Sequence, residues 1–245
     1  MFNHLINIQE TPNAIALLID PDKSDNGPIL LTTLQKAHFA NIDFIFIGGS
    51  TVTRSSFQKT VTFIKENSTL PLIIFPGSAQ QISEKADALL YLSLLSGRNP
   101  DFLIGHHIES ALELVAMNLE IIPTGYLLID GGTQSSVAYV SQTTPIPREN
   151  ISIVRRTAIA GKLQGKKLLF LDAGSGAKFS VPTQMVQAIK DLGIPLIVGG
   201  GVKNIAQIEA LHNAGASVVV IGNKIEEDVD FLLEIKEYRN EGMKE

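Results

Sequence analysis

Short apolar runs alternate with longer amphipathic segments along the whole chain. The runs are rich in Ile, Leu and Val and rarely alternate with polar residues, a pattern typical of parallel strands buried on both faces. They cover residues 14–20, 43–48, 70–75, 88–92, 121–130, 167–172, 194–199 and 217–222. Segments with helical spacing lie between them, at residues 28–40, 54–67, 101–119, 150–164, 181–192, 204–214 and 226–238. This alternation predicts an α/β fold, a (β/α)8 TIM barrel that takes up residues 1–245 as one domain.

Two connections depart from a regular barrel. Only residues 77–87 are available for a helix between the third and fourth runs, roughly two helical turns, which is short for a crossover between parallel strands. We therefore expect the third helix to be shortened or replaced by a loop. After the fifth run, residues 131–149 form a long insertion whose segment 143–148 contains two prolines and cannot be a regular helix. Because loops after barrel strands carry active sites, this insertion is a candidate lid or substrate wall.

The segment 101–119 carries an apolar stripe and a pair of histidines. We interpret the stripe, formed by Leu103, Ile108, Leu112 and Val115, as core packing. Adjacent histidines project about 100° apart on a helix, so the pair at 106–107 does not readily share a metal ion. We expect packing or surface roles for both.

Composition and charge narrow the function classes. The chain is 44% hydrophobic and 18% charged, which suits a packed core and argues against disorder. Its net charge of −5 gives no support for nucleic-acid binding, and the lack of cysteine excludes disulfides and thiolate chemistry. No apolar run approaches the ~20 residues that span a bilayer, and the first residues do not resemble a signal peptide. We therefore expect a cytoplasmic protein without stable membrane insertion.

Glycine-marked turns follow the last three apolar runs. They read Phe-Leu-Asp-Ala-Gly-Ser-Gly at 170–176, Val-Gly-Gly-Gly at 198–201 and Val-Ile-Gly-Asn at 220–223. Glycine allows backbone N–H groups to approach a ligand closely, and the N-terminus of a following helix favours an anion. Because consecutive strands are neighbours in a barrel, the three turns predict one shared phosphate site.

Polar oxygens follow the first two runs. Asp20 and Asp22 flank a proline, and Ser50 follows a pair of glycines. Carboxylate and hydroxyl oxygens on adjacent strand ends suit a hard cation such as Mg²⁺. The alternatives are an Asx turn at Asp20 and a helix N-cap at Ser50, since both are common roles for these residues.

Asp172 ends the sixth run, inside the first glycine-marked turn. A carboxylate there repels phosphate, so we expect it to accept a proton from, or to orient, a hydroxyl of a phosphorylated substrate. The alternative is a turn residue that holds the neighbouring N–H groups.

The ordered set of motifs resembles the geranylgeranylglyceryl phosphate synthase family and its bacterial relatives. The motifs are Ile-Asp-Pro-Asp-Lys at 19–23, Ile-Gly-Gly-Ser at 47–50, Gly-Tyr-Leu-Leu-Ile-Asp-Gly-Gly at 125–132, Thr-Pro-Ile-Pro-Arg at 144–148, Asp-Ala-Gly-Ser-Gly at 172–176, Gly-Gly-Gly at 199–201 and Ile-Gly-Asn at 221–223. Together they extend over nearly the whole chain. The proline loop and the Asp-Ala-Gly-Ser-Gly turn are most similar to the family's second major group, which is archaeal and bacterial and related to the heptaprenylglyceryl phosphate synthases.

The resemblance implies a prenyltransferase. Its substrates would be a prenyl diphosphate, with geranylgeranyl diphosphate the expected donor, and sn-glycerol 1-phosphate, whose 3-hydroxyl becomes an ether while diphosphate is released. It implies a barrel that lacks the third helix, Mg²⁺ held by Asp20 and Ser50, and a homo-oligomer, either a dimer or a hexamer. Some relatives carry glutamate where this chain has Asp172, so whether this carboxylate is a base or only orients the hydroxyl stays open.

The resemblance also implies a substrate-binding set, with Asp172 as its catalytic member. The set comprises Lys23, Tyr126, Phe170, Leu171, Asp172, Ala173, Gly174, Ser175, Gly176, Gly200, Gly201, Gly222 and Asn223. The prenyl tail needs an apolar groove, which we expect in the gap left by the missing third helix. Candidates for its lining are Leu92, Leu94 and Leu95.

Two other interpretations compete with prenyl transfer. One is a phosphate-sugar isomerase or synthase barrel of the amino-acid biosynthesis type, for which Asp20 and Asp172 are the candidate acid and base and which Mg²⁺ dependence would discriminate. The other is a barrel that binds a phosphorylated metabolite without catalysis. The polar residues kept at several strand ends argue against this second interpretation.

Overall fold

Eight parallel strands form a closed barrel at the centre of the molecule. The computed structural model describes residues 4–24 and 27–242. Strands pair in chain order, and β8 returns to lie beside β1. Their bounds are β1 (Ala14–Ile19), β2 (Phe44–Ile47), β3 (Leu72–Ile74), β4 (Ala88–Leu94), β5 (Glu120–Leu128), β6 (Leu168–Asp172), β7 (Leu196–Gly199) and β8 (Val218–Ile221). The predicted TIM barrel is confirmed.

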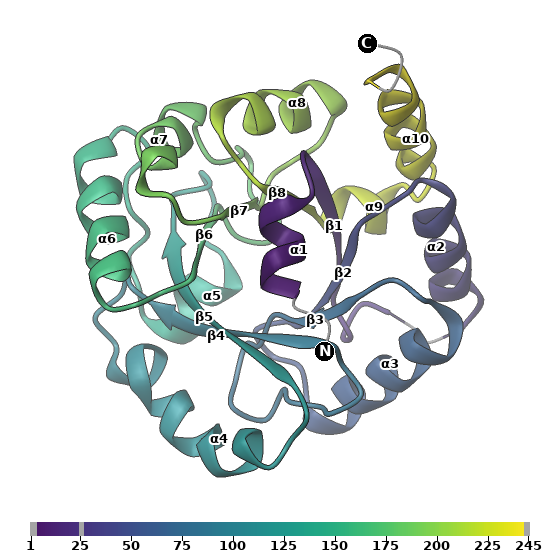
Figure 1. Ribbon diagram of the computed structural model, residues 1–245, viewed down its shortest axis with the longest axis horizontal. Helices are drawn as coiled ribbons and strands as arrows, with labels where there is room; N and C mark the ends of the chain where they lie inside the picture. The colour runs from purple at the N-terminus through teal and green to yellow at the C-terminus, as the bar shows by residue number, and fades with distance from the viewer. Residues whose placement is uncertain (1–3, 25–26, 243–245) are drawn as a thin grey trace.

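Helices surround this barrel as an outer ring (Figure 1). The α-helices are α1 (His4–Glu10), α2 (Pro28–Phe39), α3 (Arg54–Asn67), α4 (His106–Val115), α5 (Ser136–Ser141), α6 (Ile151–Leu163), α7 (Thr183–Gln187), α8 (Ile205–Ala214), α9 (Asn223–Glu227) and α10 (Phe231–Gly242). A π-helical turn η1 (Asp101–Gly105) precedes α4, and a 3-10 turn η2 (Lys190–Leu192) follows α7.

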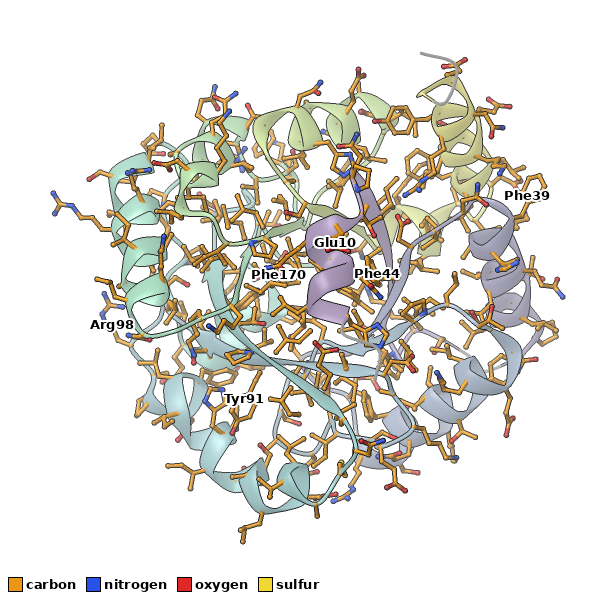
Figure 2. All side chains as sticks on the ribbon, viewed as in Figure 1. Glu10, Phe39, Phe44, Tyr91, Arg98 and Phe170 are labelled. Atoms are coloured by element: carbon orange, nitrogen blue, oxygen red, sulfur yellow. The ribbon has the colours of Figure 1, made fainter. Side chains whose placement is uncertain are left out.

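Side chains of the strands contribute to two apolar layers, one inside the barrel and one between the barrel and its helices. On β6, Phe170 belongs to the inner layer, whereas Leu169 and Leu171 belong to the outer one. Figure 2 shows Phe44 and Phe170 near the middle of the barrel and Phe39 at its rim. This alternation follows from the two-residue period of a strand and decides which strand-end residues face the barrel axis.

The N-terminal helix α1 closes one end of the barrel. Figure 1 shows it lying across the middle of the ring. Ile8 of α1 is fully buried with the inner apolar layer, and the backbone N–H of His4 donates to the carboxylate of Glu120, at the start of β5. The covered end is therefore that of the strand N-termini, and the opposite end remains for a site.

The crossover from β3 to β4 contains no helix. Residues 75–87 run as turns and extended chain. A polar side chain, Gln81, is completely buried in this crossover. The predicted replacement of the third helix by a loop is confirmed.

The helical predictions need adjustment in several places. The segment 181–192, predicted as one helix, forms the short helix α7 and the 3-10 turn η2. Helix α1 was not expected from the sequence. The segment 226–238, predicted as one helix, divides into α9 and α10 because Asp228 ends α9 and its carboxylate accepts the N–H of Asp230. Within the long insertion, a short helix α5 forms where Ser135 caps the N–H of Ala138, whereas 143–148 stays irregular as expected.

The predicted core stripe of the α4 segment was wrong. Leu112 and Val115 are 89% and 87% exposed, and Ile108 is also exposed, whereas Leu103, in η1, is half-buried. The buried residues of α4 are His107, Ser110 and Leu114. Ile108, Leu112 and Val115 share one face of α4, but apolar residues lie on both sides of this helix, so the hydrophobic pattern alone does not show which face is buried.

Candidate active site

A cavity of about 390 Å³ lies at the C-terminal end of the strands. It has a polar part between the strand ends and an apolar arm that extends toward α4. The polar part is lined by Asp20, Lys23, Gly49, Ser50, Asp172, Ser175, Gly176, Gly200, Gly201, Gly222, Asn223 and Glu226. Loops from five strands (β1, β2, β6, β7 and β8) thus meet here, as in other TIM barrels.

Most residues expected from the sequence line this cavity. The structure brings together both proposed metal ligands, Lys23, Tyr126 and members of all three glycine-marked turns. The exceptions are Leu171, Ala173 and Gly174, which do not line it. Leu171 and Ala173 lie in the apolar layer between barrel and helices, because alternate β6 side chains point away from the axis.

Asp172 is buried at the base of the polar part and accepts two hydrogen bonds. The Tyr126 hydroxyl donates to Oδ2 at 2.5 Å, and the Gly174 N–H donates to Oδ1 at 2.8 Å. Burial raises the pKa of Asp172, and these two hydrogen bonds partly oppose that rise. Burial and the neighbouring carboxylate together raise the pKa of Tyr126 well above its ordinary value. The tyrosine therefore stays a donor that holds the carboxylate in place.

The first two glycine-marked turns pack directly on each other. Gly200 has a φ of +79°, and a Cβ there would lie 2.6 Å from Asp172 Oδ1 and from the Gly174 nitrogen. The Ala173 N–H donates to the Gly199 carbonyl across the strand pair. Glycine at 200 is needed both for its backbone conformation and for this close approach.

The third turn is joined to the first by Asn223. Its side-chain oxygen accepts from the Gly176 N–H at 3.0 Å and from the Ser175 hydroxyl at 3.1 Å. A backbone N–H and a hydroxyl therefore converge on one acceptor at the rim of the cavity. A phosphate oxygen uses the same kinds of donor.

Lys23 extends over this rim from the loop after β1. Its ammonium group forms an ion pair with Glu226 at 2.8 Å and lies 3.5 Å from the Ser175 hydroxyl. The Glu226 carboxylate also accepts from the Asn223 amide at 3.3 Å. One cation therefore lies beside the donors of the first and third turns.

The donors at the ends of β1 and β2 fit a hard cation. Asp20 and Ser50 line the same cavity, and a Cβ at Gly49 would lie 2.8 Å from Asp20 Oδ1. Burial raises the pKa of Asp20, a cost that a bound cation would offset. Among the described residues, no group of three or more His, Cys, Asp or Glu could hold a metal. Asp20 and Ser50 would suit Mg²⁺, which commonly takes one or two protein carboxylates together with water or substrate oxygens.

The apolar arm leaves the barrel interior where the third helix is missing. Inside the barrel it begins at Phe75, Tyr126 and Phe170, whose rings pack with centroids 4.8–5.7 Å apart. Outside it continues between β4 and α4, lined by Ile82, Leu89, Tyr91, Phe102, His106, His107, Ser110 and Leu114. Leu92 and Leu94 line the cavity as expected. Leu95 does not, because its side chain packs between Gly125 and Gly161.

The packing role expected for the histidine pair is confirmed, but the sequence did not show that both rings line the cavity. The His107 ring stacks on Tyr91 with centroids 3.8 Å apart, and its Nε2 is 2.7 Å from the Leu92 carbonyl. Burial lowers the pKa of His107, so the ring stays neutral at physiological pH. His106 lines the cavity too, with its ring edge-on to Phe102. The π-helical turn that places both rings here left no signal in the hydrophobic pattern.

The long insertion after β5 forms part of the cavity wall, as the sequence predicted. Val137 and Val140 of α5 line the cavity. Ile146 pairs with the strand extension at Ile129, which fixes the far end of the insertion to the barrel.

Comparison with known proteins places these features in a family. Residues 8–239 match the model of the PcrB family. The chain belongs to that family. Geranylgeranylglyceryl phosphate synthase of Zunongwangia profunda is 49% identical over 215 residues, which cover 86% of this chain and 90% of that protein. The synthase of Korarchaeum cryptofilum is 35% identical over 227 residues, which cover 92% of each chain.

Solved structures of geranylgeranylglyceryl phosphate synthases share the fold. (S)-3-O-geranylgeranylglyceryl phosphate synthase from Thermoplasma acidophilum, in complex with its substrate sn-glycerol-1-phosphate, has a TM-score of 0.89 and 33% identity. The alignment covers 96% of both chains. The enzyme from Thermoplasma volcanium has a TM-score of 0.87 and 30% identity, over 95% of this chain and 93% of that one. This PcrB-family chain is thus a prenyltransferase of the same type. Within its described residues, no helix has the length and apolar content to cross a membrane.

Proposed function

We propose that this protein joins a prenyl diphosphate to the 3-hydroxyl of sn-glycerol 1-phosphate. The products are a prenylglyceryl phosphate ether and diphosphate, and geranylgeranyl diphosphate is the proposed donor. The observation that carries the proposal is the continuous cavity, in which a buried carboxylate and glycine-marked anion donors open into a long apolar arm. A phosphate-sugar isomerase has no use for such an arm. The names of the relatives, at up to 49% identity among those described above, support the same reaction.

The turns after β6, β7 and β8 would bind sn-glycerol 1-phosphate. Ser175 and Gly176 supply a hydroxyl and an N–H beside Asn223, and Lys23 supplies a positive charge. Substrate phosphate would compete with Glu226 for Lys23 and with the Asn223 oxygen for the two donors. With its phosphate held there, the glycerol would extend toward Asp172, at the base of the same polar part.

The ends of β1 and β2 would bind the diphosphate of the donor through Mg²⁺. Asp20 and Ser50 would hold the ion, with the remaining oxygens coming from diphosphate and water. When bound, Mg²⁺ neutralises diphosphate charge and makes it a better leaving group. The prenyl tail would lie in the apolar arm, past Phe75 and between β4 and α4.

The chemical step exchanges one carbon–oxygen bond for another. The allylic C1–oxygen bond to diphosphate breaks and C1 develops positive charge, while the 3-hydroxyl oxygen of sn-glycerol 1-phosphate bonds to C1. Asp172 accepts the hydroxyl proton, and Tyr126 keeps the receiving carboxylate oriented through its 2.5 Å hydrogen bond. Holding both substrates in a reactive geometry supplies a further part of the acceleration.

The test is a product assay with purified protein, Mg²⁺ and radiolabelled sn-glycerol 1-phosphate. Separate reactions contain prenyl diphosphates of 10, 15, 20 and 35 carbons, with sn-glycerol 3-phosphate as the control acceptor. We expect an organic-extractable labelled product, formed best with the 20-carbon donor and lost when EDTA removes Mg²⁺. No extractable product with any donor, from folded protein, would contradict the proposal. Product formed equally well in EDTA would remove the Mg²⁺ part of it.

We also propose that the protein acts as a homo-oligomer in the cytoplasm. The exposed apolar residues of η1 and α4 (Ile104, Ile108, Leu112 and Val115) supply a surface that a second copy can cover. Glu109 and Glu113 on the same helix disfavour an anionic membrane there. Light scattering should give a mass that is a multiple of the 26.5 kDa chain, and a monomer at micromolar concentration would contradict self-association.

A further inference from the structure

Gln81 is a completely buried amide in the crossover that lacks a helix, and it does not line the cavity. Both the oxygen and the nitrogen of its side chain form hydrogen bonds with backbone groups of neighbouring loops. Oε1 accepts from the Gly77 N–H at 2.9 Å and from the Gly49 N–H at 3.4 Å. Nε2 donates to the Gly49 carbonyl at 2.7 Å and to the Val52 carbonyl at 3.5 Å. A buried amide bound at both ends fixes the groups around it.

The loop that Gln81 holds is the one that carries Ser50. Gly49 lies between Gln81 on one side and Asp20 on the other, since a Cβ on Gly49 would come within 2.8 Å of Asp20 Oδ1. The backbone of the crossover presses on the same loop, because a Cβ on Gly77 would lie 2.2 Å from the Gly49 carbonyl oxygen. The position of Ser50 relative to Asp20 is therefore set by contacts from the crossover.

We infer that Gln81 is a positioning residue that sets the spacing of Asp20 and Ser50 and thereby the affinity of this end of the cavity for Mg²⁺ with diphosphate. The inference rests on the proposed function for the chemistry of the ligand. A primary amide suits this task because the Gly49 peptide presents both an N–H and a carbonyl. A carboxylate cannot donate to the carbonyl, and a thioether replaces neither hydrogen bond well.

Because of its location, Gln81 should affect only one end of the cavity. Its hydrogen bonds reach the loops after β2 and β3, and among the described residues none reaches the turns after β6, β7 and β8. Loss of the amide should therefore lower the affinity for Mg²⁺ with diphosphate and leave the affinity for sn-glycerol 1-phosphate unchanged. A residue that only stabilised the fold would affect both ends or neither.

The experiment compares Gln81→Met and Gln81→Glu with the control Gln58→Met. Gln58 of α3 donates to the Ile82 carbonyl at 2.6 Å, so its hydrogen bond supports the same crossover and does not involve the Ser50 loop. Calorimetry measures two affinities in each folded variant, one for Mg²⁺ with inorganic diphosphate and one for sn-glycerol 1-phosphate alone. Thermal melting checks folding, and the Mg²⁺ concentration for half-maximal activity is a second readout.

We expect Gln81→Met to weaken Mg²⁺–diphosphate binding by about tenfold or more, as substitutions behind a metal ligand do, and to change glycerol phosphate affinity less than twofold. Gln58→Met should leave both affinities unchanged. Should Gln81→Met fail to fold, Gln81→Glu keeps the length and the acceptor of the side chain and is expected to show the same split. Unchanged Mg²⁺–diphosphate affinity, or equal weakening at both ends, would overturn the inference, as would a wild type that binds no Mg²⁺–diphosphate. A wild type that binds both ligands yet forms no product would instead overturn the proposed function.

Discussion

Asp172 combines two features that a proton acceptor needs. Burial raises the pKa of its carboxyl, which increases its basicity once it is ionised. Hydrogen bonds from Tyr126 and Gly174 limit this rise and fix the orientation of both oxygens. Activity that requires the carboxylate should therefore fall as the pH drops through this raised pKa.

Replacing Tyr126 with Phe should move this acid limb to higher pH. The tyrosine hydrogen bond lowers the pKa of Asp172, so its loss leaves the burial effect less opposed and the carboxyl protonates at a higher pH. The measurement is kcat/KM against pH for wild type and Tyr126→Phe. Tyr139→Phe serves as the control because Tyr139 is exposed on α5. An acid limb that stays in place, or one that moves to lower pH, would show that Tyr126 does not control this carboxyl.

At the residue scale, the sequence predicted the polar residues at the C-terminal ends of the strands. Asp20 and Asp172 stand out because each ends an apolar run, and Ser50 stands out because it lies two residues after one. The partners of these groups are set by strand register, as Tyr126 and Asp172 show: Tyr126 pairs with Phe170 across β5 and β6, and this brings its hydroxyl to Asp172. Gln81 had no sequence signal, because its partners are backbone atoms of distant loops.

The packing of β6 and β7 constrains Gly200 in two ways. Any side chain at 200 would enter the space of Asp172 Oδ1 and would also have to adopt a φ of +79°. Both constraints act on the same turn, which is the one proposed to hold glycerol phosphate.

We expect Gly200→Ala to raise the KM for sn-glycerol 1-phosphate by about tenfold or more, because the added Cβ would lie 2.6 Å from Asp172 Oδ1 and from the Gly174 nitrogen and must displace the turn that holds this substrate. The KM for prenyl diphosphate should stay within twofold. Steady-state kinetics with each substrate varied separately gives both values, and Gly165→Ala is the control, since its φ is also positive but nothing lies within 4 Å of its added Cβ. A Gly200→Ala enzyme with an unaltered acceptor KM would contradict the placement of glycerol phosphate at this turn.

At the element scale, the spacing of the apolar runs predicted the eight strands. It also predicted the missing third helix, because residues 77–87 are too few for a usual helical crossover between parallel strands. The sequence did not predict which face of α4 packs against the barrel. Apolar residues occur on both sides of this helix, and only packing against β4 shows that His107, Ser110 and Leu114 face inward. The missing helix and the inward face of α4 together create the apolar arm, so its general place was predictable and its lining was not.

On the scale of the whole molecule, the two ends of the barrel differ: one is closed by packing and the other carries the candidate site. Helix α1 covers the N-terminal end of the barrel (Figure 1), and the cavity occupies the C-terminal end. Within the cavity, the proposed cation end at β1 and β2 and the proposed phosphate end at β6 to β8 lie on different strands, and the buried Asp172 carboxylate lines the same cavity. This arrangement accommodates one anionic acceptor and one amphipathic donor, which is the combination that prenyl transfer requires.

The most direct test of this account follows the oxygen of the 3-hydroxyl. Purified protein is incubated with Mg²⁺, geranylgeranyl diphosphate and sn-glycerol 1-phosphate labelled with ¹⁸O at the 3-hydroxyl, and both products are analysed by mass spectrometry. We predict an ether lipid that carries all of the ¹⁸O and a diphosphate that carries none, because the glycerol oxygen attacks C1 and the donor C1–oxygen bond breaks. Labelled diphosphate, an unlabelled lipid, or no lipid product would contradict it.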